Sequence, residues 1–240
     1  MEGKDIKIII SGLTGKMGKS LESTVKDIRF KELFSNLEII PFESLSDLQN
    51  KDSSVIIDFS EASNTLEVLK EATEQRIPMV IGTTGFNEEQ YKTITDCSNN
   101  IPIVLEPNTS IGIATLKSML SSVKDFNFND ASTKVEIVEK HHKDKKDSPS
   151  GTSKDLISYI KEEISEDLNI EIKSIRQDDI AGEHIVSFIN QDETLKISHK
   201  AHDRSIYSRG ALLAAIWLDR NRELLGVYKM PNIYLSLEED

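Results

Sequence analysis

The chain has 240 residues, of which 38% are hydrophobic, and its 41 acidic and 29 basic side chains give a formal net charge of −12. This composition predicts a globular protein with a core, and the acidic balance argues against general nucleic-acid binding. No apolar run is long enough for a membrane span, and the first residues lack a signal-peptide pattern. The single cysteine, Cys97, excludes an internal disulfide and is compatible with the cytoplasm.

The first hundred residues alternate short apolar runs with helical patterns. Strands are predicted at 6–10, 55–59, 78–81 and 101–105, with two more near 30–34 and 37–42. A helix follows the first strand, with an apolar face running from Met17 to Ile28. Such alternation predicts βαβ units and a parallel sheet.

After about residue 130 the apolar residues recur at every second position, as in strands with two different faces. This pattern covers "KVEIVEKHH" and residues 184–201, which contain a turn at 191–193, and a helix is predicted at 153–168. The small, apolar helix "GALLAAIWLDRNRELLG" is expected to return to the first domain. The fold class is therefore α/β, with a Rossmann-type domain at 1–110 and 206–240 and an α+β domain on a mixed sheet at 111–205.

A glycine-rich turn, "GLTGKMG", separates the first strand from its helix. It is a variant of the dinucleotide fingerprint, in which Gly12 permits a tight turn and Gly18 lets the helix pack closely. The N-terminus of the helix then offers free N–H groups to a pyrophosphate. An ordinary strand–helix turn is the alternative. Arg29 and Lys31 could serve a ribose 2′-phosphate and Glu32 a ribose hydroxyl, but surface charge is the favoured interpretation of all three, so the choice of cofactor stays open.

Two further polar segments end predicted strands, "IGTTGF" and "EPNTSIG". Ligands of doubly wound sheets lie beyond the carboxyl ends of strands, so these segments are candidates for the nicotinamide end of a dinucleotide. Turn chemistry is the competing interpretation, because Gly, Thr, Asn and Ser favour turns on their own account.

The stretch "KHHKDKKDSPSGTSKD", residues 140–155, gathers histidines, lysines and a helix start in an acidic chain. If His141 and His142 both prolong a strand, their rings point to opposite faces, which argues against one shared metal. A histidine can supply a proton, Lys145 can neutralise a carboxylate, and the helix start at 150–152 offers N–H groups to an anion. The alternative is a solvated basic loop.

This stretch resembles a family signature, E-x-H-H-x-x-K-x-D-x-P-S-G-T, of 4-hydroxy-tetrahydrodipicolinate reductase, also called dihydrodipicolinate reductase. The matching residues are Glu139, His141, His142, Lys145, Asp147, Pro149, Ser150, Gly151 and Thr152. The segments "GLTGKMG", "VIIDFS", "VIGTTGF", "PNTSIG", "GEHIVSF" and "ISHKAHDRSIYSRGALLAAIWL" are similar to that family too, so the resemblance covers nearly the whole chain.

The resemblance implies an enzyme of lysine and diaminopimelate biosynthesis. It would pass a hydride from NADPH or NADH to a ring with two carboxylates, giving tetrahydrodipicolinate. His141 is implied as proton donor and Lys145 as its catalytic partner. Substrate contacts are implied for His142, Ser150, Gly151 and Thr152. Cofactor contacts are implied for Gly12, Leu13, Thr14, Gly15, Lys16, Met17, Gly82, Thr83, Thr84, Glu106, Pro107, Asn108 and Thr109.

The resemblance also implies a cytoplasmic homotetramer, assembled through the sheet of the second domain, with no metal, nucleic-acid or membrane partner. Some residues depart from the family pattern. Glu106 and Thr109 replace a small residue and Phe, and Ser148 replaces Ala. Near Arg204, which matches an active-site arginine, Tyr207 and Arg209 are unusual.

Three other interpretations stay open. The first is a dehydrogenase of another small dicarboxylate, such as an amino-dicarboxylate. The second is a nucleotide-sensing protein with a degenerate site. The third is a metal site formed by His141, His142 and His184.

Overall fold

The structure, a computed structural model, describes residues 5–40, 42–49, 54–126, 132–143, 145, 147–177 and 180–237. The chain forms two compact units, one made of Met1–Ser110 with Ser205–Asp240 and the other of Ile111–Arg204. None of the described helices is long and apolar enough to cross a membrane.

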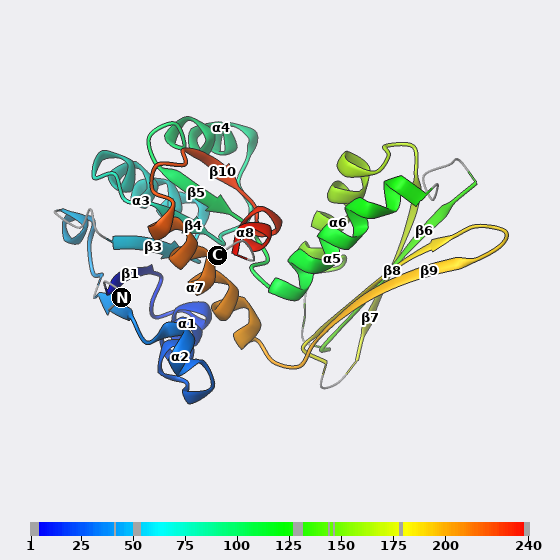
Figure 1. The fold of residues 1–240 in the computed structure, drawn as a ribbon, viewed down its shortest axis with the longest axis horizontal. Helices are drawn as coiled ribbons and strands as arrows, with labels where there is room; N and C mark the ends of the chain where they lie inside the picture. The colour runs from blue at the N-terminus through cyan, green and yellow to red at the C-terminus, as the bar shows by residue number, and fades with distance from the viewer. Residues whose placement is uncertain are drawn as a thin grey trace. The chain divides into compact units, whose positions relative to one another are not determined.

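The first unit is a six-stranded parallel sheet in the order β10-β5-β4-β3-β1-β2. Its strands are β1 (Ile6–Ser11), β2 (Leu37–Ile40), β3 (Ser54–Asp58), β4 (Met79–Ile81), β5 (Pro102–Leu105) and β10 (Gly226–Tyr228). Its longer helices are α1 (Lys16–Lys26), α3 (Ala62–Glu74), α4 (Glu88–Cys97), α7 (Ser205–Arg220) and α8 (Met230–Leu237). The parallel sheet expected from the βαβ pattern is confirmed (Figure 1).

The core of this unit explains the apolar runs in its sequence. All five residues of β3 are buried, as expected of a central parallel strand that is covered on both faces. Helices α3 and α4 contribute Val68, Leu69 and Ile94 to the cluster on one side of the sheet. The other side is covered by α1 and by α7, in which residues 210–218 are buried.

A close approach of backbones joins α7 to the segment after β5. A Cβ atom at Gly210 would lie 1.6 Å from the carbonyl oxygen of Thr109, so only glycine fits there. The hydroxyl of Thr109 donates to the carbonyl of Tyr207 over 2.7 Å. The polar segment after β5 is therefore fixed against the helix.

The strand predicted near 30–34 is wrong, because this segment is helical. Ile28–Phe30 form a 3₁₀ turn and Lys31–Phe34 form α2. The carboxylate of Asp27 accepts from the backbone N–H of Arg29 and caps the turn. The rings of Phe30 and Phe34 lie 6.1 Å apart, a contact that a spacing of four residues makes along a helix.

The end of the predicted first helix is also corrected. Helix α1 ends at Lys26, and Ile28 is 84% exposed rather than part of the buried face. Ile28 belongs to the capped turn that follows, so the helical spacing of apolar residues continued by chance beyond the helix.

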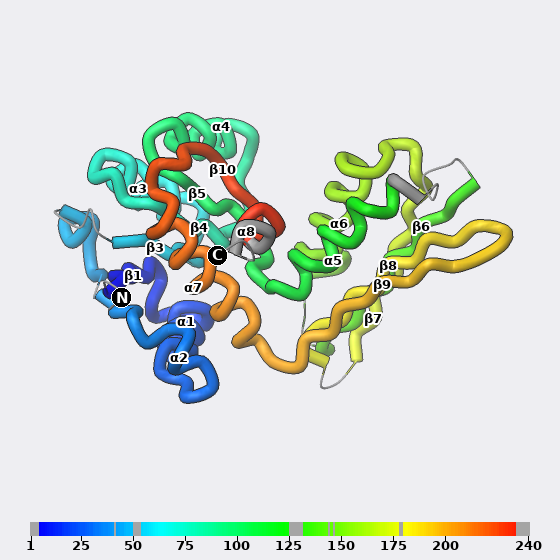
Figure 2. The backbone as a smooth tube through the Cα atoms, viewed as in Figure 1, coloured from blue at the N-terminus to red at the C-terminus, as the bar shows by residue number. Residues whose placement is uncertain are grey.

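The second unit is a four-stranded sheet in the order β7-β6-β8-β9, in which only β6 and β7 are parallel. Its elements are α5 (Ile111–Ser122), β6 (Lys134–His141), α6 (Gly151–Glu163), β7 (Asn169–Arg176), β8 (Gly182–Ile189) and β9 (Thr194–Ala201). The mixed sheet and the turn at 191–193 are confirmed. Helices α5 and α6 cover one face of the sheet, and the tube in Figure 2 follows the long hairpin of β8 and β9.

Two elements of this unit were not predicted. The first is α5, whose sequence "IGIATLKSMLSS" is apolar on most sides and lacks a clear helical period. The second is β7, an edge strand with three of its eight residues exposed, which begins directly after the predicted helix 153–168. Helix α6 in fact ends at Glu163, five residues earlier than expected.

The sheet face under the two helices is layered along the strands. The register places two apolar rows across the four strands in the order β7, β6, β8 and β9. The first is Ile170, Val135, Phe188 and Leu195, and the second is Ile172, Ile137, Val186 and Ile197. The next row along the strands is polar. The apolar rows therefore form a floor that ends in a band of ionisable side chains.

Candidate active site

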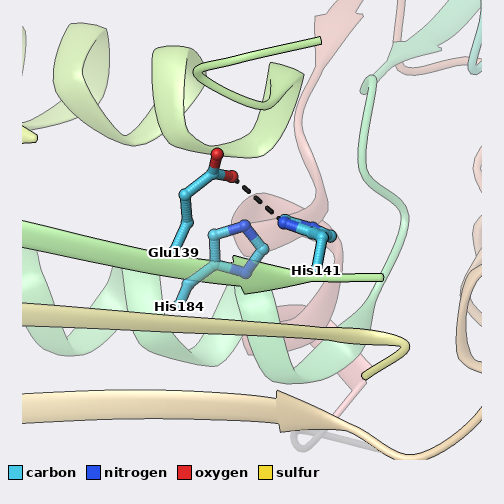
Figure 3. Close-up of side chains that lie close together, drawn as sticks. All are labelled: Glu139, His141 and His184. Carbon is cyan, nitrogen blue, oxygen red and sulfur yellow. Dashed lines mark ion pairs between the residues drawn. The ribbon is translucent and has the colours of Figure 1, made fainter. Parts of the chain in front are cut away.

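The polar row beyond the apolar floor is assembled by register. It runs across the sheet as Ser174, Glu139, His184 and His199, and the following row pairs Arg176 with His141. Glu139, His141 and His184 are each at most 6% exposed. Figure 3 shows the Glu139 carboxylate and both imidazoles on the same side of the strands. Four strands thus bring together ionisable groups that lie far apart in sequence.

Glu139 is the anionic centre of this group. Its Oε1 accepts from Nη2 of Arg176 over 2.9 Å and from the backbone N–H of Ser150 over 3.2 Å. Its Oε2 accepts from Oγ of Ser153 over 3.2 Å. Burial by itself raises the pKa of Glu139, but the hydrogen bonds with Ser150, Ser174 and Arg176, and next the charge of His141, bring it down to about 2. The carboxylate is therefore ionised at neutral pH despite its burial.

His141 ends β6, and its Nδ1 lies 3.2 Å from Oε2 of Glu139 (Figure 3). Its ring meets that of His184 edge to face, with 5.1 Å between the centroids. Burial lowers the pKa of His141, while the charge of Glu139 raises it and the charges of Lys145 and Arg176 lower it. The net direction is downward, so the burial of this imidazole outweighs the opposing charge of Glu139.

His184 differs from His141, because it is a neutral group throughout the physiological range. Burial, and next the charge of His141, lower its pKa to about 3. Its Nε2 lies 3.3 Å from Oγ of Ser150. Ser150 is the N-cap of α6, and its Oγ also accepts from the backbone N–H of Ser153. The Ser150 hydroxyl is thus used inside the cluster.

His142 lies just past the end of β6 and outside the cluster. Its Nε2 accepts from Nη2 of Arg204 over 3.0 Å. Whereas His141 is 6% exposed, His142 is half-buried. The two neighbouring histidines thus have different partners, and only His141 belongs to the strand that was expected to contain both.

Lys145 is connected to the N-terminus of α6 by the carboxylate of Asp147. Its Nζ lies 2.8 Å from Oδ1 of Asp147, and Oδ2 of Asp147 accepts from the backbone N–H of Gly151 over 3.3 Å. Arg176 fixes the same loop, because its Nη2 donates to the carbonyl of Asp147 and its Nε to that of Lys145. A lysine, a guanidinium and a helix N-terminus therefore meet within one loop, although residues 144 and 146 lie outside the described part.

The cluster has a composition that a metal ion could use, since single ligand atoms of Glu139, His141 and His184 lie within 4.8 Å of one another. The Glu139 carboxylate, however, already accepts from Arg176, Ser150 and Ser153. A guanidinium in contact with the same carboxylate opposes a second cation. The set therefore fits a hydrogen-bonded acid–base cluster, and His142 of the predicted metal trio does not belong to it.

The first unit holds a hollow of about 560 Å³ at the glycine-rich turn. It is lined by Ser11, Gly12, Leu13, Thr14, Phe42, Glu43, Ser60, Glu61 and Asn64. Gly12 has a φ of 79°, and a Cβ at Gly18 would lie 2.5 Å from the carbonyl oxygens of Gly12 and Leu13. Gly15 is the N-cap of α1, and Lys16 and Met17 begin the helix. The turn therefore has the tight approach and free N–H groups that a pyrophosphate needs.

The segments after β4 and β5 also lie at carboxyl ends of parallel strands, and their side chains are mostly engaged. Thr83 donates to the buried carboxylate of Asp58 over 2.6 Å. Asn108 accepts from the backbone N–H of Ser110 over 3.0 Å. Glu106 is 1% exposed and accepts from the backbone N–H of Met230, the first residue of α8. The carboxylate that departs from the family pattern is thus directed at a helix N-terminus.

Of the other predicted cofactor residues, Pro107 follows β5 and Thr84 follows β4, and both are exposed. Two candidate residues escaped the sequence analysis. Glu43 lines the hollow just after β2, and an acidic residue placed directly after the second strand would have been the signal. Arg176 was missed because β7, the strand that carries it, was not predicted.

Comparisons with known proteins agree over nearly the whole chain. The family model "Dihydrodipicolinate reductase, N-terminus" matches residues 6–109, and "Dihydrodipicolinate reductase, C-terminus" matches residues 112–234. Two relatives are called 4-hydroxy-tetrahydrodipicolinate reductase. One, from Methanoregula boonei, is 31% identical, covering 97% of this chain and 99% of that protein. The other, from Caldanaerobacter subterraneus, is 36% identical, covering 95% and 98%.

Solved structures share the fold. The dipicolinate-bound dihydrodipicolinate reductase from Paenisporosarcina sp. TG-14 matches with a TM-score of 0.72 and 20% identity, covering 95% of this chain and 99% of that one. GenD2 from gentamicin A biosynthesis, solved in complex with NAD, matches with a TM-score of 0.59 and 8% identity, covering 100% of this chain and 93% of that one.

Proposed function

This chain belongs to the dihydrodipicolinate reductase family, and we propose that it reduces 4-hydroxy-tetrahydrodipicolinate to tetrahydrodipicolinate in lysine and diaminopimelate biosynthesis. The observation that carries the proposal is the pairing of a buried, ionised Glu139 with His141 beside a loop that presents Lys145. The relatives with that activity, similar over nearly the full length, support it. Cytoplasmic location is part of the proposal and is supported by the single cysteine.

The overall reaction removes the 4-hydroxyl group of the substrate as water and adds a hydride and a proton to the ring. A bound reduced nicotinamide supplies the hydride, and the glycine-rich turn of the first unit has the geometry to hold its pyrophosphate. Protonated His141 delivers the proton to the reduced ring. General acid catalysis of this kind contributes roughly 10²- to 10⁴-fold. Glu139 favours the charged imidazole that the step requires.

The substrate carries two carboxylates, and the second unit has donors for both. We assign one carboxylate to Lys145 and the start of α6 at Gly151 and Thr152, where it would take the place of the Asp147 carboxylate that now contacts Lys145 and Gly151. We assign the other carboxylate to His142 with Arg204. Charge-assisted hydrogen bonds of this type are the strong ones. The hydroxyl of Ser150 is engaged in the cluster, so any substrate contact at that residue falls to a group other than the hydroxyl.

We propose that the chain prefers NADH to NADPH. Glu43 lies at the hollow just after β2, where an acidic side chain in such folds accepts from the ribose 2′-hydroxyl. The described residues that line the hollow include two carboxylates, Glu43 and Glu61, and no basic side chain. A 2′-phosphate would meet repulsion there. Glu43→Gln should shift the kcat/KM ratio toward NADPH by about tenfold, equal to about 1.4 kcal/mol, whereas the exposed Glu38→Gln on β2 should leave the ratio unchanged.

We also propose that the chain assembles as a homotetramer through the outer face of the second sheet. Helices α5 and α6 both pack on the opposite face. At the centre of the outer face, Val138 pairs in register with Ile185, and both are partly exposed. Light scattering should give four times the mass of 27.0 kDa. Ile185→Lys should reduce the assembly, whereas an unchanged mass would point to another interface.

The proposed activity is tested by steady-state assays with freshly generated substrate and each reduced nicotinamide cofactor. Oxidation of the cofactor at 340 nm, dependent on that substrate, is expected. Turnover of aspartate but not of this substrate would instead favour an amino-dicarboxylate dehydrogenase. Nucleotide binding without turnover of either would favour a sensor. Loss of activity after addition of a metal chelator would favour a metal site at Glu139, His141 and His184.

A further inference from the structure

We propose that Glu139 and Arg176 form a positioning pair that fixes the imidazole of His141 and the loop carrying Lys145 in one arrangement. Neither residue is expected to touch substrate or cofactor, so both act through their neighbours. The inference rests on the proposed function for its effect on rate, but the arrangement itself is testable without turnover.

Arg176 connects two parts of the site. Its Nη2 donates to Oε1 of Glu139 over 2.9 Å and to the carbonyl oxygen of Asp147 over 2.5 Å. Its Nε donates to the carbonyl oxygen of Lys145 over 3.4 Å. One planar guanidinium thus binds the carboxylate beside His141 and two carbonyls of the loop that follows it. A lysine at this position has a single ammonium group, which lacks the fork that reaches these acceptors together.

Glu139 receives a directional chain of hydrogen bonds from the other side. The hydroxyl of Ser150 donates to Oγ of Ser153 over 3.0 Å, and the hydroxyl of Ser153 donates to Oε2 of Glu139. Because the proton of Ser150 is used in this way, the 3.3 Å contact between its Oγ and Nε2 of His184 requires the histidine nitrogen to donate. The chain therefore begins at a neutral His184 with its proton on Nε2 and ends on the carboxylate.

The nitrogen of His141 that faces Glu139 is set by this arrangement. Nδ1 of His141 is buried, and within the described residues it makes no hydrogen bond besides its 3.2 Å ion pair with Oε2 of Glu139. A proton on Nδ1 is stabilised by the carboxylate, which leaves Nε2 as the nitrogen that exchanges a proton with a reacting group. The same logic, a carboxylate behind an imidazole, fixes the tautomer in other acid–base sites.

Several charged groups face His141, and they decide how its titration depends on the pair. They are Glu139 on its own strand, Arg176 on β7, His184 on β8, and Lys145 and Asp147 in the loop. Glu139 is the nearest anion, and Asp147 is already paired with Lys145. Removing the charge of Glu139 leaves cations as the main neighbours of the ring, so a protonated His141 becomes harder to form.

The first test is Glu139→Gln, which keeps the shape and removes the charge. We expect kcat to fall by about 10- to 100-fold, the size seen when the group that orients a functional histidine is lost, while KM for the dicarboxylate changes less than about twofold. The basic limb of the pH–rate profile should move to lower pH. The matched control is Glu162→Gln, exposed on α6, which should change neither. An unchanged pH profile in a folded variant would overturn the proposal.

The second test needs no turnover and separates this inference from the proposed function. In ¹⁵N-histidine-labelled protein, the His141 signals are assigned by comparison with His141→Gln and followed against pH. In Glu139→Gln the titration of His141 should move down by one pH unit or more. If the reductase assay fails for the parent chain but this shift appears, the positioning pair stands and the proposed reaction falls. If the titration does not move, the pair is structural only.

The third test is Arg176→Lys, which keeps the charge and loses the fork. Because Arg176 also holds the carbonyls of Lys145 and Asp147, this variant should raise KM for the dicarboxylate by about tenfold in addition to lowering kcat. Glu139→Gln and Arg176→Lys thus predict different KM-against-kcat patterns. Arg220→Lys, an exposed residue of α7, is the control. A shared pair would be contradicted if the two single variants changed KM equally and if these changes were additive in the double variant.

Discussion

In the first unit the hollow is lined by a glycine-rich turn with small, apolar and acidic side chains, whereas in the second unit the cluster consists of buried ionisable side chains of β6 and β8, joined by Arg176 of β7. Gly12 and Gly18 shape the hollow because neither residue has a side chain. Glu139, His141 and His184 shape the cluster by charge and hydrogen bonding. The hollow is thus sensitive to added volume, and the cluster is sensitive to lost charge.

This difference also separates binding from proton transfer. A turn with free N–H groups binds a phosphate through fixed dipoles and needs no titration. An acid must change its protonation state, so its neighbours must balance burial against charge, as Glu139 and Lys145 do around His141. Variants in the two units should therefore affect different kinetic constants, and four predictions test that separation, from the largest expected effect to the smallest.

The largest effect is expected for His141→Gln, which removes the proton donor. Turnover should fall by about 10²- to 10⁴-fold because general acid catalysis is lost, while nucleotide affinity should stay the same. Steady-state kinetics and nucleotide titration measure both. The control is His202→Gln, an exposed histidine of the same unit. A similar loss in turnover and in affinity for the dicarboxylate would argue against an acid role.

Lys145→Ala should have the next largest effect, a drop of about 10- to 100-fold in kcat/KM. Its ammonium lies beside the N-terminus of α6 and is assigned to a substrate carboxylate, a charge-assisted bond worth about 1.5–3 kcal/mol. Lys154→Ala, exposed on the same helix, is the control. An unchanged rate with the dicarboxylate would remove Lys145 from the site.

Gly18→Ala tests the glycine-rich turn of the first unit. Its new Cβ would lie 2.5 Å from two backbone oxygens of the turn, so the turn must move. Such crowding costs about 1–3 kcal/mol, and KM for the nucleotide should rise about tenfold with a smaller change in the pH profile. Ser23→Ala, exposed on the same helix, is the control. Normal nucleotide binding by Gly18→Ala would show that the turn does not contact the cofactor.

The smallest effect is a loss of stability in acid that originates in the second unit. His184 has a folded pKa of about 3, below its ordinary value of 6.5, so the unfolded chain gains a proton first and stability falls as the pH drops below about 6.5. Glu139 has a folded pKa of about 2, below 4.5, so its contribution is present above pH 4.5 and is lost as the pH falls toward 2. The two losses have the same sign, and each is at most about 1.4 kcal/mol per pH unit.

Urea denaturation at pH 7.5 and pH 5.0 measures this decline. His184→Gln should reduce the difference in the free energy of unfolding between the two pH values, whatever it does to the absolute stability. His202→Gln should leave the difference as it is. An equal decline in His184→Gln would assign the acid sensitivity to other groups, such as His141 or His199, whose pKa values burial also lowers.

Sequence patterns predicted the first unit better than the second. Central parallel strands such as β3 are buried on both faces, so their apolar runs stand out. Edge strand β7 and helix α5 carry weaker patterns, because β7 has one exposed side and α5 is apolar on most sides. The segment near Phe30 was misjudged because aromatic residues suit strands in general, while the cap at Asp27 made it helical.

The sequence by itself determined the two-unit α/β organisation, the glycine-rich turn, and the membership of His141 and Lys145 in one signature, because each depends on residues close together in the chain. Only the tertiary structure decided that Arg176, His184 and Ser150 surround Glu139, because strand register brings together residues up to 45 positions apart, from Glu139 to His184. Register depends on the apolar rows of the sheet packing under α5 and α6, and this long-range constraint leaves no local signal in the chain.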